Sequence, residues 1–194
     1  MQGLFNFVVK PKGSRYNNVK KIGDKELILN AEIFSHQYVN REAIVVSLPK
    51  IVKTDIKVGD TVVIHHNVFR RWHDQQGVEK NSRSYFKEDK YFVNTDQIFL
   101  YKQKGKWSSQ TDYCFVKPLQ SDNIYDDKEK PLIGVVKYTN KHLNINEGDL
   151  IGFTPNSEYE FIIDGERLYR VLSKFITIKY EYQGNEKEYN PSWT

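Results

Sequence analysis

The chain has 194 residues, enough for one large domain or for two domains of about 100 residues each. Its 29 basic and 25 acidic residues give a formal net charge of +4, and their even scatter along the chain argues against an extended nucleic-acid-binding surface. The aromatic share of 14% argues against extended disorder, and no apolar segment approaches the length that spans a membrane.

The single cysteine, Cys114, excludes an internal disulfide and a zinc site built from cysteines. It stands between Tyr113 and Phe115 in an apolar run, which is typical of a buried strand residue rather than of a nucleophile. The N-terminus lacks the charged and then apolar pattern of a signal peptide. We therefore expect a cytoplasmic protein that makes no membrane contact.

The first strand-like segment covers residues 4–10 and is expected to end at Pro11, because proline cannot donate to a strand ladder. Residues 12–25 are polar and rich in turn formers, so they are predicted to form an exposed loop. Directly after this loop comes a short apolar triad, Leu27, Ile28 and Leu29, with polar neighbours on both sides. Residues 42–47 are then predicted to form a second strand.

Residues 56–64 read IKVGDTVVI and place a Gly-Asp turn directly before a run of branched residues. Gly59 can adopt the positive φ angle that a tight turn needs, and Asp60 can bond its own backbone two residues on. The valines and isoleucine that follow favour a pleated strand. The motif therefore predicts a turn that begins a buried strand.

The rest of the first half is predicted to contain a polar hairpin around residues 74–77, paired strands at 83–87 and 91–94, and a closing strand at 96–101. Residues 104–111 then change the composition abruptly and are predicted to be a solvated linker. The basic residues Lys102, Lys104 and Lys106 beside Trp107 leave open a contact with a phosphate backbone.

The second half repeats the order of the first. The string INEGDLIGF at residues 145–153 matches residues 56–64, and residues 115–118 match residues 8–11. The difference in residue number between matching positions of the two halves becomes smaller along the chain, and it changes only across loops. This indicates that the second half has deletions confined to its loops. Because sustained helical periodicity is absent, we predict an all-β chain of two tandem small barrels, at residues 1–103 and 112–183, with a polar tail at 184–194.

This order of features resembles the chaperonin-10 co-chaperonins, the GroES-like family. The matching pieces are a strand ending in Val-Lys-Pro, a polar loop with an apolar triad, a strand, the string IKVGDTVVI and a closing strand. The string VGDTVVI at residues 58–64 is the most specific of them. The resemblance covers both halves and implies two tandem GroES-like β-barrels.

The resemblance also implies a function, because members of this family form rings that cap a chaperonin cylinder through mobile loops. By position, Leu27, Ile28 and Leu29 correspond to the apolar triad that binds a GroEL-like chaperonin ring. The protein would then be a homo-oligomer that assists protein folding, since a ring sums several weak contacts. The alternative for residues 27–29 is an ordinary strand inside the barrel.

Several departures from the family pattern favour an unusual member. The second half has no triad in residues 121–130, and both halves are too short between strands to hold the hairpin that roofs a typical ring. Such a form suits a bacteriophage or another virus that modifies the folding machinery in its host's cytoplasm. The alternative is a virion structural or adaptor protein whose barrels assemble through edge strands such as residues 4–10 and 96–101.

An enzyme is the third class, and the sequence argues against it. The chain has no Gly-x-Gly-x-x-Gly turn and no serine, cysteine or lysine with an activating partner, so we expect no catalytic residue and no cofactor. The cluster with metal-binding chemistry is His65, His66, His73 and Asp74. Adjacent histidines on a strand point to opposite faces, so we expect no metal site.

Overall fold

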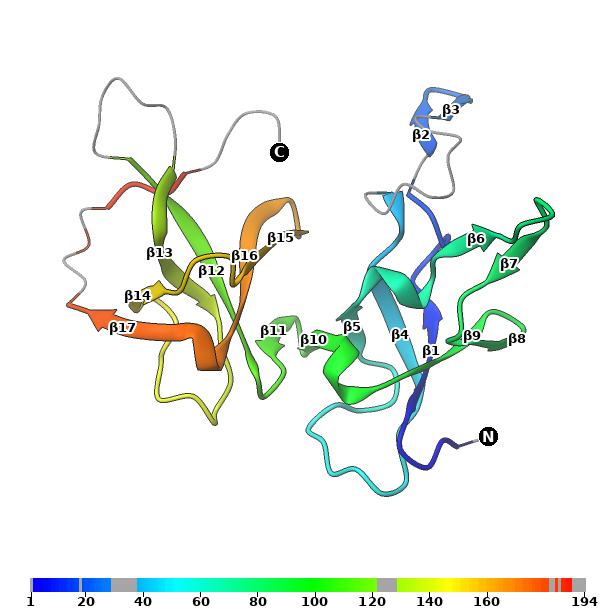
Figure 1. Ribbon diagram of the computed structural model, residues 1–194, viewed down its shortest axis with the longest axis horizontal. Helices are drawn as coiled ribbons and strands as arrows, with labels where there is room; N and C mark the ends of the chain where they lie inside the picture. Colours follow the sequence, from blue (N-terminus) through cyan, green and yellow to red (C-terminus); the bar gives the residue numbers. More distant parts are fainter. Residues whose placement is uncertain are drawn as a thin grey trace. The chain divides into compact units, whose positions relative to one another are not determined.

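The computed structural model describes residues 2–17, 19–28, 38–121, 129–181, 184 and 186–189. These residues form β-strands joined by turns and short 3-10 helices, without an α-helix among them (Figure 1). The all-β prediction is therefore confirmed. The chain divides into two compact units, Met1–Lys106 and Trp107–Thr194.

One sheet has the strand order β11-β10-β5-β4-β1-β9-β8, and all of its strands except β11, which begins at the last residue of the first unit, lie in that unit. The hairpins β2-β3 and β6-β7 of the first unit are separate two-stranded sheets. The bounds are β1 (Phe7–Pro11), β2 (Val19–Ile22), β3 (Lys25–Ile28), β4 (Glu42–Ser47), β5 (Thr61–Ile64), β6 (Arg71–His73), β7 (Glu79–Asn81), β8 (Tyr85–Lys87), β9 (Lys90–Val93), β10 (Ile98–Gln103) and β11 (Lys106–Ser109), with 3-10 turns η2 (His66–Val68) and η3 (Thr95–Gln97).

The core of the first unit is made by one face of this sheet. In β4 buried and less buried residues alternate, so that Ala43 and Val45 are buried, whereas Phe7, Val8 and Val9 of β1 are all buried. Residues outside the strands complete the same cluster, among them Ile56, Val68 and Phe69. The apolar face is thus covered by segments between strands as well as by the strands.

The second unit contains one sheet in the order β15-β16-β12-β13-β14-β17. The bounds are β12 (Tyr113–Gln120), β13 (Glu129–Tyr138), β14 (Leu150–Phe153), β15 (Glu158–Ile163), β16 (Glu166–Leu172) and β17 (Ile176–Tyr180), with the 3-10 turn η4 (Ser173–Phe175) before β17. This order is the same as β8-β9-β1-β4-β5-β10 in the first unit.

The two Gly-Asp turns make the same hydrogen bonds in the two units. Gly59 has a φ of 91°, donates to the Val45 carbonyl at 2.8 Å and precedes Asp60, whose carbonyl accepts from Val45. Gly148 has a φ of 89° and donates to the Val136 carbonyl at 2.8 Å. Each turn therefore fixes where the strand after it enters the sheet, as the sequence predicted for the first copy.

The prediction of closed barrels is wrong for the described residues. Each sheet has two end strands that do not pair with each other, namely β8 and β11 in one sheet and β15 and β17 in the other. A barrel closes only when the end strands pair. Here residues between the strands cover the core instead, so its burial does not require that pairing.

Three further expectations differ from the structure. Residues 106–109 of the expected linker form β11, in which Trp107 and Ser109 are buried. The expected edge strands are interior strands, since β1 lies between β4 and β9 and β10 lies between β5 and β11. In the expected polar tail, the Tyr189 amide donates to the Pro118 carbonyl at 2.9 Å.

Candidate functional site: the β2–β3 hairpin

The segment predicted as an irregular loop contains a regular hairpin. β2 and β3 pair antiparallel, with Val19 opposite Ile28 and Ile22 opposite Lys25. Gly23 and Asp24 form the two-residue turn, and Gly23 has a φ of 61° while Asp24 is not among the residues with positive φ. This combination is the type II′ turn, which matches the twist of paired strands and prefers glycine at its first central position.

The hairpin exposes apolar side chains. Leu27 of the predicted triad is 52% exposed, and Ile22 is 59% exposed. The strand register places Ile22, Lys25 and Leu27 on the same face of the hairpin. Ile28 is the last residue of β3, and Leu29 lies outside the described residues.

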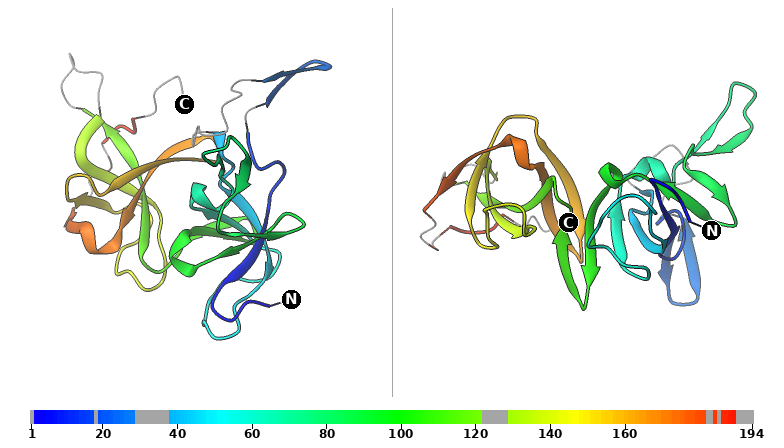
Figure 2. Two further views of the ribbon diagram at one scale, coloured as in Figure 1. Left: turned by 45° about the vertical axis from the view of Figure 1, so that its right-hand side comes forward. Right: turned by 90° about the horizontal axis from the view of Figure 1, so that it is seen from below.

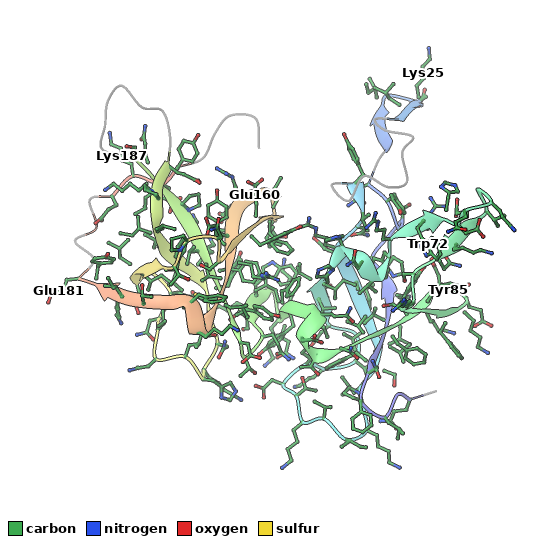
Figure 3. All side chains as sticks on the ribbon, in the orientation of Figure 1. Lys25, Trp72, Tyr85, Glu160, Glu181 and Lys187 are labelled. Carbon is green, nitrogen blue, oxygen red and sulfur yellow. The ribbon has the colours of Figure 1, made fainter. Side chains whose placement is uncertain are left out.

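Among the described strands, those of the hairpin pair only with each other, and the hairpin extends away from the main sheet of its own unit (Figures 1 and 2). In Figure 3 the labelled Lys25 stands at the far end of the hairpin from that sheet. The alternative, a strand within the main sheet, therefore does not describe residues 25–28. The Leu27 side chain is displayed rather than packed in the core.

The two chain segments that lead to and from the hairpin are tied together at the sheet. Asn40 is 4% exposed, and its side-chain amide donates to the carbonyls of Lys12 at 3.0 Å and Ser14 at 2.8 Å. The Asn40 side-chain oxygen accepts the Glu42 amide at 2.8 Å. Tyr16 pairs with Val39 in an isolated antiparallel bridge.

Arg15 adds a second anchor at this base. Its guanidinium donates to the Phe69 carbonyl at 2.9 Å and to the Asn81 side chain at 2.8 Å, and lies 5.3 Å from the centre of the Tyr91 ring. The cation is therefore held by the core of the unit and by β7. A fixed base and a projecting end are suited to presenting a short apolar element to a partner.

Sequence reasoning missed Ile22, which shares the exposed face with Leu27. The signal was present, because Gly23-Asp24 separates two four-residue runs, VKKI and KELI. Two residues of this type between strand-like runs indicate a hairpin. The polar residues and turn formers of residues 12–25 favoured the prediction of an exposed loop instead.

The β6–β7 hairpin also displays apolar side chains in the first unit. Trp72, labelled in Figure 3, is 46% exposed and its indole nitrogen donates to the Asn81 carbonyl at 3.2 Å. Asp74 closes the turn by accepting the amides of Gln76 and Val78 at 3.0 and 2.9 Å. The bond from Val78 is the main cause that holds the pKa of Asp74 below its ordinary value.

The histidine cluster makes local contacts. The rings of His65 and His66 stack with centroids 4.4 Å apart, and the Nδ1 atom of His65 accepts the Asn67 amide at 3.1 Å, which places it at the start of η2. Within the described ranges no group of three or more His, Cys, Asp or Glu residues is placed to hold a metal ion.

Cys114 is fully buried in the core of the second unit. Burial raises the pKa of its thiol to about 12, so that the thiol is uncharged at neutral pH. The thiolate is the reactive form of cysteine. The position thus agrees with a packing role.

A scan against protein-family models found no matching family, and a search of the curated proteins found no match. In the part of the chain that the structure describes, no helix has the length and apolar character needed to cross a membrane.

Proposed function

We propose that this protein is a co-chaperonin that binds a chaperonin ring through the β2–β3 hairpin and the apolar residues 27–29, without catalysing a reaction. The observation that carries the proposal is the exposure of Ile22 and Leu27 on a hairpin outside the main sheet. The proposal agrees with the resemblance to GroES-like proteins in the order of sequence features and in residues 58–64.

The hairpin supplies a physical mechanism. Transfer of an exposed aliphatic side chain into an apolar groove stabilises a complex by about 1.5–3 kcal/mol. A preformed hairpin loses less conformational entropy on binding than an irregular loop does. One hairpin with a few such side chains still binds weakly, so we propose a homo-oligomer whose hairpins engage the ring together.

The test is capture of a chaperonin in the presence of nucleotide by the full chain and by variants. Replacement of Leu27, Ile28 and Leu29 by serine is expected to abolish capture, and Ile22→Ser to weaken it. The matched control is Val78→Ser, since Val78 is 48% exposed on the β6–β7 hairpin of the same unit. Unchanged capture by the triple variant would falsify the proposal.

A virion structural or adaptor protein is the second candidate. The observation that favours it is the open edge of β17, where Ile178 and Tyr180 are exposed. Sheet edges of this kind support assembly. Detection of the chain in purified virus particles, together with failure to capture a chaperonin, would favour this candidate over the first.

A further inference from the structure

The outer surface of β14 carries a groove in the second unit. The register of the sheet puts Gly152 between Ile133 of β13 and Ile178 of β17 in one cross-strand row. Glycine has no side chain there, and an open groove of about 440 Å³ results. An added Cβ at Gly152 would lie 3.2 Å from the ring of Tyr180, so this ring already lies against the glycine. Ile133, Phe153, Ile178 and Tyr180 are among the lining residues.

The corresponding row in the first unit is covered. There Val63 of β5 pairs with Leu100 of β10, and both side chains are fully buried. In the second unit Ile178 is 49% exposed and Tyr180 is 41% exposed. The two copies of one strand arrangement therefore differ at this face, and the second copy leaves apolar surface at a sheet edge.

The two edges of the second sheet differ in charge. β15 carries Glu158 and Glu160, and an antiparallel pairing of two β15 strands centred on Glu160 would set like charges opposite each other. In Figure 3 the labelled Glu160 and Glu181 mark these two sides of the unit, since Glu181 directly follows β17. In this register β15 is disfavoured from pairing with itself.

β17 has the opposite character. Its one charged residue, Lys179, lies 2.6 Å from the carboxylate of Asp149 in the same unit. An antiparallel pairing of two β17 strands centred on Ile178 sets Ile178 opposite its own copy and Lys179 opposite Thr177. No like charges meet in this register, and branched side chains form the central pair.

We propose that β17 is a self-association edge, at which two copies of this chain pair their β17 strands antiparallel about a two-fold axis through Ile178. The pairing extends the row of Ile133, Gly152 and Ile178 into the same row of the second copy. It covers exposed apolar surface and satisfies the edge backbone of both strands. The occupant is a second copy because the strand is complementary to itself in apolar character and charge.

The first test is cross-linking of the full chain through an introduced cysteine. The natural Cys114 is fully buried and is expected to form no disulfide in the folded protein. Ile178→Cys is expected to form, on mild oxidation, a disulfide-linked species of twice the 22.9 kDa chain mass. The matched control is Ile162→Cys, at a residue 56% exposed on β15, and it is expected to stay unlinked.

The second test is sedimentation velocity over a range of concentrations. The unmodified chain is expected to associate, and Ile178→Lys, which sets like charges opposite each other, to raise the dissociation constant roughly tenfold or more. Ile162→Lys is expected to behave as the unmodified chain does. A monomeric unmodified chain, an Ile178→Cys chain that stays unlinked, or equal effects of the two lysine substitutions would each overturn the proposal.

Discussion

The carboxylate of Asp149, in the turn before β14, lies 2.6 Å from the ammonium group of Lys179 in β17. In the first unit the equivalent Asp60 instead accepts a 2.7 Å hydrogen bond from the side-chain amide of Gln103 in β10. Both aspartates also accept a backbone amide within their own turn, at 2.7 Å in each case. Each Gly-Asp turn is therefore joined to the strand that pairs with the strand it begins, by an ion pair to β17 in one unit and by a neutral amide of β10 in the other.

The ion pair predicts a pH-dependent contribution to stability. Burial acts to raise the pKa of Asp149, but the hydrogen bonds from Lys179 and from the Asn146 amide outweigh it and hold the pKa below its ordinary value. A carboxyl whose pKa is lowered by folding stabilises the fold above its unfolded pKa, and this contribution is lost as the pH falls through the folded value. In urea unfolding at pH 7, Asp149→Asn is expected to have a lower free energy of unfolding than the unmodified chain. This difference in free energy is expected to shrink below about pH 4.

A double-mutant cycle with Lys179→Met provides the control for this prediction. If the ion pair is responsible, the effects of Asp149→Asn and Lys179→Met on the free energy of unfolding are expected to be non-additive. Additive effects, or a difference that persists unchanged to pH 3, would show that the carboxylate acts through another group.

A substitution in the turn of the β2–β3 hairpin is expected to weaken chaperonin binding without changing the stability of the rest of the first unit. Gly23 has a φ of 61°, which a β-branched residue adopts only with strain, so Gly23→Val is expected to disfavour the hairpin by about 1–2 kcal/mol. Because β2 and β3 pair only with each other among the described strands, the midpoint of urea unfolding is expected to stay unchanged. Chaperonin capture is expected to weaken several-fold.

Gly77→Val is the matched substitution for this experiment, because Gly77 has a φ of 77° in the turn of the β6–β7 hairpin. It is expected to strain that turn and to leave chaperonin capture intact. Equal losses of capture in the two variants would contradict a specific role of the β2–β3 hairpin.

The buried amide of Asn40 predicts a defect at the base of the hairpin. Asn40→Ala leaves the carbonyls of Lys12 and Ser14 and the amide of Glu42 without this partner, and is expected to lower the free energy of unfolding by about 1–3 kcal/mol. Hydrogen exchange is expected to accelerate in residues 12–17 more than in β5. Asn67→Ala, at an exposed residue of η2, is the control and is expected to change neither quantity.

The burial of Cys114 predicts protection from thiol reagents. Since its pKa is raised to about 12 and the side chain is fully buried, alkylation at pH 8 is expected to proceed only as fast as the second unit opens. Mass spectrometry of alkylated protein with and without urea checks this. Rapid alkylation of the folded chain would contradict the buried position.

Much of the local structure could be predicted from the sequence. Residues 42–47 form a strand with the predicted bounds, and the turn at Gly59 and Asp60 has the predicted positive φ angle. These features depend on alternation of apolar residues and on the few residues that tolerate such a turn. The alternation of apolar residues and the turn-forming residues can both be recognised within a few consecutive residues of the sequence.

The candidate site could be predicted only in part, because it depends on which strands pair and not on local sequence alone. The apolar triad was visible, but its status as a displayed hairpin or as a core strand was open, because a short apolar run fits both. Leu27 is exposed since β3 pairs with β2 and with no strand of the main sheet. Ile22 joins the site only through the register of that pairing.

The sequence by itself determined that the chain is all-β and that a Gly-Asp turn begins a strand in each half, because strand periodicity and turn chemistry act between near neighbours. Only the tertiary structure decided that, among the described strands, the sheets stay open, β1 and β10 are interior and β17 is an edge. Strand pairing joins residues far apart in the chain, so which edges remain free depends on the arrangement of all the strands.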